Sequence, residues 1–296
     1  MDVRESRIAV DGGDLVVIDY GGTGHDVLLV HSVCQSSPVW NDVAGILAEH
    51  AHVVAVDLRG HGQSTAQPRE ITQIPDDLAH LIATLGLDRP VLVGHEVAGG
   101  FVAEVAASHP ELVGAVVVID SPVVEPREIV RAMVRAMGTP EVIRDITDRF
   151  GFGQTGPDTE TMKTFIDEHT ERNLGDPLSA APDERTTRAL RERATVARDD
   201  GSWVFRPTPE AIAALTADPD TSPFQPGIEL LAELQVPVTI VTVTDQRHGA
   251  GGTSTSELAA RHPSFHLVSL ETDSYVLYKD PQGVVSAVLE TVEHIG

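Results

Sequence analysis

The sequence has little cysteine, a deficit of basic residues and no long apolar run. A single cysteine, Cys34, excludes an internal disulfide and any metal site built from several cysteines. No stretch approaches the roughly 20 apolar residues that cross a bilayer, and the first ten residues lack the basic start and apolar run of a signal peptide. We therefore expect a cytoplasmic protein without a membrane segment.

The charge balance narrows the range of partners. Lysine and arginine number 21 against 45 aspartates and glutamates, which gives a net charge of −24. This excess argues against binding to nucleic acid or to an anionic membrane surface. With 296 residues, of which 41% are hydrophobic, the chain can bury a large core. We expect the partner to be a small hydrophobic molecule, and a homodimer is also compatible with the sequence.

Short β-rich runs alternate with amphipathic helical patterns along much of the chain. The predicted strands are residues 15–20, 27–30, 53–56, 91–93, 115–119, 238–243 and 266–270. Helical periodicity is clearest over residues 74–85, 99–108 and 281–295. Strands that are apolar on both faces are typical of a doubly wound, mostly parallel sheet with helices on both sides. The first two strands are predicted to form an antiparallel edge hairpin closed by Gly21, Gly22 and Gly24.

This alternation stops near Pro122 and resumes near Val236. Between them lie helical patterns at residues 128–137, 140–150, 159–171 and 183–198. We interpret residues 122–235 as a helical cap over a pocket, and residues 1–121 and 236–296 as the α/β core.

The segment VLVGHEVAGG, residues 91–100, places a polar residue at a sharp turn between a strand and a helix. Small residues at Gly94, Ala98 and Gly99 permit the tight turn that lifts the central side chain, Glu96, above the sheet. This pattern is typical of a nucleophile elbow.

Further motifs follow in a consistent order. Residues 31–34 read His-Ser-Val-Cys, residues 57–64 read DLRGHGQS, and Val236-Pro237 and residues 272–281 stand near the C-terminus. Together with the elbow, this series resembles the α/β-hydrolase superfamily over essentially the whole chain. The resemblance implies an oxyanion hole formed by the Val33 and Val97 amides and a loop oriented by His31.

The residues of the usual catalytic triad are replaced. Glu96 stands at the nucleophile position, and Ser274 falls where the resemblance places the histidine. The acid position falls near Asp245 and His248, and Asp120 resembles an alternative acid position of some dehalogenases. Without serine and histidine at these positions, the mechanism of an ordinary serine esterase is excluded.

Three hypotheses remain for Glu96. The favoured one makes it a general acid or base in a non-hydrolytic reaction of a small metabolite, such as an elimination, isomerisation or cyclisation. A second makes it a carboxylate nucleophile, since the epoxide hydrolases and haloalkane dehalogenases that the sequence resembles use aspartate at this position. The third is a ligand-binding relative without catalysis.

The remaining site residues are expected to shape the pocket. We expect Ser32, Ser274 and Cys34 to be its polar groups, and the aromatic side chains of Trp40, Trp203 and Tyr275 to line it. A lone intracellular cysteine is most often an inert small hydrophobe. No ligand spacing for a metal is found, and no cofactor is expected.

Overall fold

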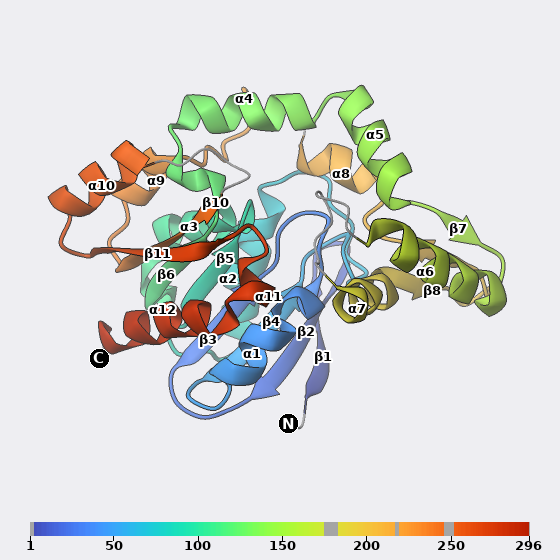
Figure 1. The fold of residues 1–296 in the computed structure, drawn as a ribbon, viewed down its shortest axis with the longest axis horizontal. Coiled ribbons are helices and arrows are strands. Elements are labelled where there is room, and N and C mark those ends of the chain that lie inside the picture. Colours follow the sequence, from blue (N-terminus) through green and yellow to red (C-terminus); the bar gives the residue numbers. More distant parts are fainter. Residues whose placement is uncertain (1–2, 175–182, 217–218, 246–251, 296) are drawn as a thin grey trace.

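The computed structural model describes residues 3–174, 183–216, 219–245 and 252–295. Its centre is an eight-stranded sheet with the order β1-β2-β4-β3-β5-β6-β10-β11, in which β1–β2 and β2–β4 are antiparallel and the other pairs are parallel (Figure 1). The strands are β1 (Arg4–Val10), β2 (Gly13–Gly21), β3 (Asp26–Val30), β4 (His52–Asp57), β5 (Val91–His95), β6 (Ala115–Ile119), β10 (Val238–Asp245) and β11 (Phe265–Asp273). The mostly parallel α/β fold expected from the alternating pattern is confirmed.

The predicted hairpin between the first two strands is wrong. The strand over residues 15–20 is β2, which pairs with β1 on one side and β4 on the other, whereas β3 lies between β4 and β5. The apolar residues Val27 to Val30 of β3 are fully buried, so this strand is placed inside the sheet rather than at its edge. Gly21, Gly22 and Gly24 carry the chain out of β2 with positive φ angles instead of closing a hairpin.

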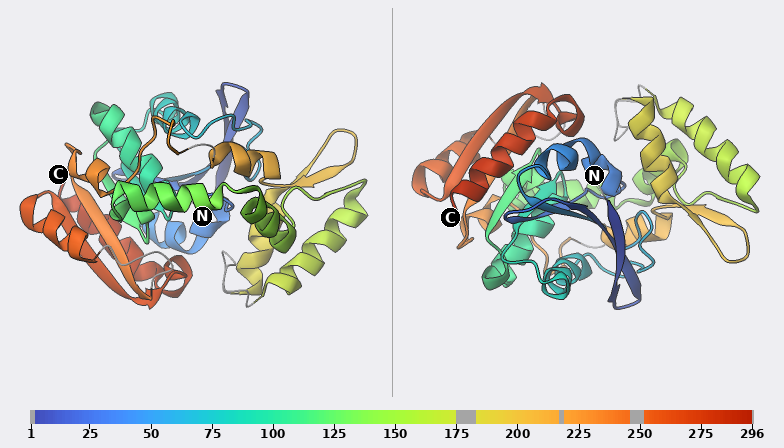
Figure 2. Two further views of the ribbon diagram at one scale, coloured as in Figure 1. Left: turned by 90° about the horizontal axis from the view of Figure 1, so that it is seen from above. Right: turned by 90° about the horizontal axis from the view of Figure 1, so that it is seen from below.

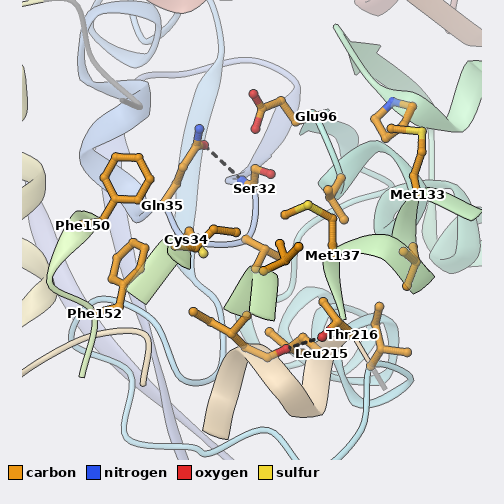
Figure 3. Close-up of a pocket in the computed structure, with 18 of the residues that line it drawn as sticks. Ser32, Cys34, Gln35, Glu96, Met133, Met137, Phe150, Phe152, Leu215 and Thr216 are labelled. Atoms are coloured by element: carbon orange, nitrogen blue, oxygen red, sulfur yellow. Dashed lines mark hydrogen bonds between the residues drawn. The ribbon is translucent and has the colours of Figure 1, made fainter. Parts of the chain in front are cut away.

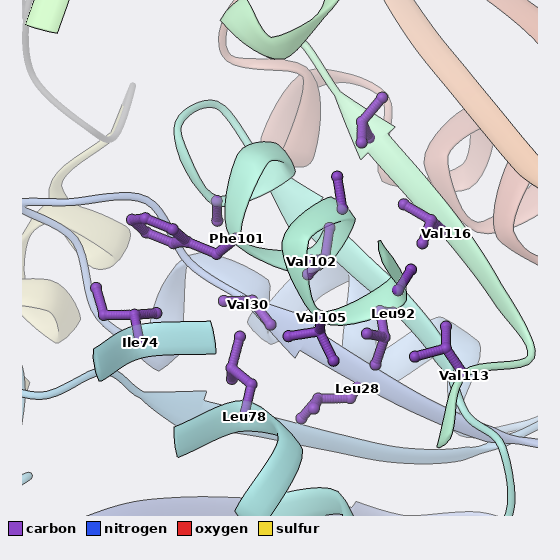
Figure 4. Packing of buried hydrophobic residues seen from close by; sticks show 14 of the residues in the cluster. Leu28, Val30, Ile74, Leu78, Leu92, Phe101, Val102, Val105, Val113 and Val116 are labelled. Atoms are coloured by element: carbon purple, nitrogen blue, oxygen red, sulfur yellow. The ribbon is translucent and has the colours of Figure 1, made fainter. Parts of the chain in front are cut away.

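Helices cover both faces of the sheet (Figure 2). The helices of this core are η1 (Ser37–Trp40), α1 (Asn41–Leu47), α2 (Gln73–Leu85), α3 (Ala98–Ser108), η2 (Pro110–Leu112), α10 (Gly252–Arg261), α11 (Val276–Lys279) and α12 (Pro281–Glu293). Apolar side chains of α2 and α3, among them Leu78 and Phe101, pack with Leu28 and Leu92 of the sheet (Figure 4). The opposite face is covered by α1, α11 and α12. The two cores fix the carboxyl ends of the parallel strands, where the site lies.

The chain between β6 and β10 adds no strand to the central sheet in the described residues. Its elements are η3 (Pro122–Val124), α4 (Arg127–Met137), α5 (Pro140–Phe150), β7 (Thr155–Gly156), α6 (Thr159–Asn173), α7 (Glu184–Ala194), β8 (Thr195–Ala197), β9 (Trp203–Phe205), α8 (Pro209–Leu215) and α9 (Ile228–Ala232). The helix predicted at residues 183–198 ends earlier, because residues 195–197 pair with β9 as a strand. The assignment of residues 122–235 as a cap stays a prediction.

Polar contacts fasten this inserted segment to the turn after β4. The Arg193 guanidinium donates to the buried Asp57 carboxylate at 2.7 Å and to Glu5 at 2.6 Å. Gln63 donates to the Arg193 carbonyl oxygen at 2.7 Å, and Arg206 donates to the Ser64 carbonyl oxygen. The turn that resembles a family motif therefore also positions α7 and β9.

No described helix is long and apolar enough to cross a bilayer.

Candidate active site

Glu96 occupies a strained turn between β5 and α3. Its φ is +49°, a left-handed conformation that costs free energy in a residue other than glycine. Three hydrogen bonds hold the turn: the Glu96 amide donates to the Ile119 carbonyl at 3.0 Å, and the Glu96 carbonyl accepts from the Gly99 amide at 3.0 Å and the Ser121 hydroxyl at 2.5 Å. The backbone thus fixes the direction of the Glu96 side chain.

The small residues around Glu96 are required by close contacts. A Cβ atom at Gly94 would lie 2.5 Å from the Ala98 carbonyl oxygen, and one at Gly99 would lie 2.3 Å from the Ser121 hydroxyl oxygen. Neither distance is tolerated between real atoms, so both positions need glycine.

Two buried histidines organise the loop that follows β3. The Leu58 amide donates to His31 Nε2 at 3.0 Å, so the proton of this ring is on Nδ1, which lies 2.8 Å from the Ser32 carbonyl oxygen. His61 is bound in the same way: its Nε2 accepts from the Cys34 amide at 3.0 Å, and its Nδ1 donates to the Arg59 carbonyl at 2.9 Å. Because both nitrogens of each ring are engaged, neither histidine is free to accept a substrate proton.

These contacts leave two backbone amides for a ligand. The Cys34 amide is used by His61, and the Ser32 amide donates to Gln35 Oε1 at 3.2 Å (Figure 3). In the described part of the chain, the Val33 and Val97 amides donate no hydrogen bond. They belong to residues that border the same cavity, as an oxyanion hole requires.

A cavity of about 1320 Å³ lies between the sheet and the inserted segment. Most of its wall is apolar and comes from α4, α5, α8 and β9. The residues in question include Val130, Met133, Val134, Met137, Ile146, Phe150, Phe152, Phe205, Ile212 and Leu215. Such a lining suits a ligand that is largely apolar, with a few polar groups to orient it.

Glu96 supplies a carboxylate to this cavity. It is partly buried, and no described residue donates a hydrogen bond to its carboxylate or forms an ion pair with it. Figure 3 shows Glu96 close to Ser32, with Leu215 at the far side of the cavity. None of the described lining residues is a histidine. Near the elbow, the described residues thus offer the Glu96 carboxylate and the Val33 and Val97 amide donors.

Several residues expected at the pocket lie elsewhere. Ser274 follows β11 and is buried, but neither it nor Tyr275 lines the cavity. Trp40 is fully buried in the core beneath α1 and contacts the edge of His95, with ring centroids 6.2 Å apart. Trp203 packs inside the inserted segment, where its indole donates to Thr161 at 3.1 Å. For both tryptophans, packing among neighbouring apolar side chains takes the place of a ligand contact.

Of the candidate acids, Asp120 does not line the cavity. Asp120 directly follows β6, with a φ of +44°, and is buried. Its Oδ2 has no hydrogen-bond partner among the described residues. Asp245 is the last residue of β10. His248 lies outside the described residues.

Cys34 borders the cavity, but its environment disfavours the thiolate. Burial, and secondly the charge of Glu96, raise the pKa of the Cys34 thiol to about 12. We expect iodoacetamide to label native protein at pH 7.5 at least ten times more slowly than urea-unfolded protein, because only the thiolate is nucleophilic. Labelling followed by mass spectrometry checks this, and equal rates would contradict the assignment of Cys34 as an inert thiol.

The buried histidines make stability depend on pH. Burial is the main cause that lowers the pKa of His61 to about 3 and also lowers the pKa of His31, from unfolded values near 6.5. Their contribution to stability is complete above pH 6.5 and is lost as the pH falls below it; for His61 the loss continues down to about pH 3, by about 1.4 kcal/mol per pH unit. Urea unfolding at pH 7 and pH 5 measures this loss. We expect H61N to reduce it and H50N, at an exposed position, to leave it unchanged; identical pH dependence in H61N and the wild type would refute this role.

Two residues near the site were missed by the sequence analysis. The Tyr278 hydroxyl is buried without a hydrogen-bond partner among the described residues, and burial, followed by the charges of Asp183, Asp42 and Glu96, raises its pKa well above 10. Arg191 of α7 lines the cavity. Neither stands in a distinctive motif: Tyr278 is three residues from the predicted Tyr275, and Arg191 belongs to a helix rich in charge.

Among the described residues, no three histidine, cysteine, aspartate or glutamate side chains gather in a way that could hold a metal ion.

Comparison with known sequences identifies similar enzymes. The chain is 34% identical over 122 residues to a fluoroacetate dehalogenase from a Burkholderia species, a match that covers 38% of this chain and 40% of that protein. It is 32% identical over 128 residues to a 2-(acetamidomethylene)succinate hydrolase from Mesorhizobium japonicum, covering 42% and 46%. A bifunctional epoxide hydrolase 2 from Rattus norvegicus is 30% identical over 151 residues, covering 49% and 26%. The chain thus spans less than half the length of these curated relatives.

Structural comparison agrees on the fold. The crystal structure of E-2-(acetamidomethylene)succinate hydrolase superposes with a TM-score of 0.72 at 20% sequence identity, covering 98% of this chain and 99% of that one. The thioesterase domain from the curacin biosynthetic pathway superposes with a TM-score of 0.69 at 18% identity, covering 98% and 100%. The sequence profile of the alpha/beta hydrolase fold matches residues 27–208, which is more than half of the chain. Because this profile matches more than half of the chain, and because the fold and the elbow agree with it, the chain belongs to the α/β-hydrolase family.

Proposed function

We propose that this protein is an enzyme in which the Glu96 carboxylate moves a proton of a small, largely apolar substrate. The reaction would need no hydrolytic water, as in an elimination, an isomerisation or a cyclisation. The observation that carries the proposal is the Glu96 carboxylate, which borders the cavity at a fixed elbow without a polar partner among the described residues.

The two amides that make no hydrogen bond among the described residues supply the complementary part of the chemistry. A substrate carbonyl oxygen would accept hydrogen bonds from the Val33 and Val97 amides. Glu96 would take the proton from the adjacent carbon; the electron pair of that C–H bond would form a C=C bond while the π pair of the carbonyl moves to its oxygen, which gives an enolate. Return of the proton to another carbon isomerises the substrate, and loss of a leaving group completes an elimination.

The histidine geometry supports proton transfer over hydrolysis through a covalent ester. Such an ester needs a base that activates water. His31 and His61 are each bound through both ring nitrogens, and the described wall of the cavity contains no histidine.

A second candidate is a carboxylate nucleophile. It is favoured by the position of Glu96 at the elbow and by the similarity to a fluoroacetate dehalogenase and an epoxide hydrolase. In that reaction a Glu96 oxygen would attack carbon while a halide or the epoxide oxygen leaves, and water would later cleave the ester.

Intact-protein mass spectrometry after incubation with epoxides, haloalkanes and activated esters separates the two candidates. Proton transfer predicts an unchanged mass on folded protein. A stoichiometric adduct that peptide mapping places on Glu96 would overturn the proposal in favour of the nucleophile, and an adduct on Cys34 would show that the thiol reacts.

A further inference from the structure

The cavity contains a second charged feature, Arg191, which the proposed chemistry does not use. Its side chain comes from α7 and borders the cavity, and the residue is 7% exposed. A buried guanidinium normally lies against a carboxylate. In the described part of the chain, Arg191 makes no such pair: one nitrogen donates to the Phe150 carbonyl at 2.9 Å, and no other polar contact of the side chain is found.

The surroundings of Arg191 hold its guanidinium in one place. Its central carbon lies 4.9 Å from the centre of the Phe205 ring, over its face. Burial alone lowers the pKa of Arg191 to about 10, so the group stays charged at neutral pH. The remaining N–H groups are not sealed in the protein, because they are absent from the buried polar atoms that lack partners. These N–H groups therefore keep some accessible surface, on a residue that borders the cavity.

The other charged residues of the cavity wall differ from Arg191. Arg131 pairs with Asp220, and Arg206 is bound to the Ser64 carbonyl oxygen. Asp145 and Asp148 border the cavity from α5, and neither forms an ion pair with Arg191. Arg149 also borders the cavity, with its central guanidinium carbon 5.8 Å from the centre of the Phe150 ring. Arg191 and Arg206 thus share the lack of a carboxylate partner among the described residues, but Arg206 donates to two carbonyl oxygens, of Gly62 and Ser64, and Arg191 to only one.

The aromatic cluster connects this cation with Glu96. Phe150, Phe152 and Phe205 pack together, and Cys34 packs against their cluster. Cys34 in turn is close enough to Glu96 for the carboxylate charge to raise the pKa of the thiol. Glu96 and Arg191 are thus two charged groups of the cavity wall that have aromatic side chains and Cys34 between them.

We infer that Arg191 receives a carboxylate of the substrate, and that the substrate is an amphipathic acid whose apolar part lies along the aromatic cluster. This inference rests on the proposed function for the reacting end of the molecule, but the anion site itself is independent of Glu96. A planar guanidinium with free N–H groups matches the two oxygens of a carboxylate, and a largely apolar wall strengthens the pairing. One cation suits a monoanion better than a phosphate dianion.

Calorimetric titration with octanoate, octanamide and octyl phosphate tests this inference. We expect wild-type protein to bind octanoate at least tenfold more tightly than the neutral octanamide, and more tightly than octyl phosphate. R191M should weaken octanoate binding tenfold or more and leave octanamide binding within threefold. R131M also removes one positive charge from the cavity wall. Because that charge is paired with Asp220, the variant should change octanoate binding less than threefold.

Three results would overturn the inference: equal binding of octanoate and octanamide to the wild type, unchanged octanoate affinity in R191M, or equal losses in R191M and R131M. Tighter binding of octyl phosphate would assign the site to phosphate esters instead of carboxylates. If R191M does not fold, two measurements still test the anion site. One is the comparison of octanoate with octanamide on the wild type, and the other is R191K, which keeps the charge and should retain part of the preference for octanoate over octanamide. Octanoate binding should persist in E96Q, so failure of the anion site and failure of proton transfer are distinguishable.

Discussion

Replacement of Glu96 by glutamine is expected to lower turnover about a thousandfold while leaving the fold intact. Glutamine has the same shape but cannot take up a proton at neutral pH, and a positioned general base contributes roughly 10²- to 10⁴-fold to a rate. Because the Glu96 carboxylate has no polar partner among the described residues, E96Q should leave the thermal unfolding temperature close to the wild-type value. Steady-state kinetics and calorimetry on the same preparation measure both effects.

Two control variants define what the loss means. E96D keeps the carboxylate but withdraws it by one methylene, and we expect a loss of roughly 10- to 100-fold because position is essential for proton transfer. C34A removes a cavity side chain whose thiol is not ionised and should change turnover less than threefold. Unchanged turnover in E96Q would rule out the proton transfer proposed for this site.

Loss of Asp77 is expected to destabilise the protein by about 3–5 kcal/mol. Asp77 accepts two hydrogen bonds from the Arg59 guanidinium, each of 2.7 Å, and Arg59 is only 1% exposed. The D77A variant would leave a buried guanidinium without its counter-charge. Because the Arg59 carbonyl binds His61, which holds the Cys34 amide, the damage should reach the oxyanion loop. Urea unfolding monitored by circular dichroism gives the difference in free energy.

The exposed pair of Arg69 and Asp11 supplies the matched control. It joins the same types of side chain at the surface, where water screens the charges, so D11A should hardly move the unfolding midpoint. Equal losses of unfolding free energy in D77A and D11A would show that burial of the Arg59–Asp77 pair contributes nothing to stability.

Much of the fold could be predicted because its signals are local. The Val-rich strands β5 and β6 are buried on both faces, which their composition already indicates. The hairpin error arose because strand order is decided by pairing between distant segments. A glycine-rich link between β2 and β3 is compatible with a hairpin, but β1 and β4 pair with the two edges of β2 and leave none for β3. Sequence spacing carries no information about that competition.

The site could be predicted only where the chain itself bends around it. Glu96, Val33 and Val97 lie at two turns whose glycines and histidines mark them in the sequence. Trp40 and Trp203 were expected in the pocket because they are large and apolar, but such residues fill a core as readily as they line a cavity. Arg191 could not be found, because its importance comes from the lack of a carboxylate partner among the described residues, which only the three-dimensional arrangement reveals.

Hydrogen–deuterium exchange of small carbon acids tests directly whether Glu96 moves a proton. Keto acids with an apolar chain would be incubated in D₂O with wild-type protein or E96Q, and loss of the signal of the proton next to the carbonyl would be followed by NMR. Our account predicts exchange with the wild type that is at least a hundredfold faster than with E96Q. Exchange at equal rates with the two proteins, or none above the buffer rate with the wild type, would contradict it.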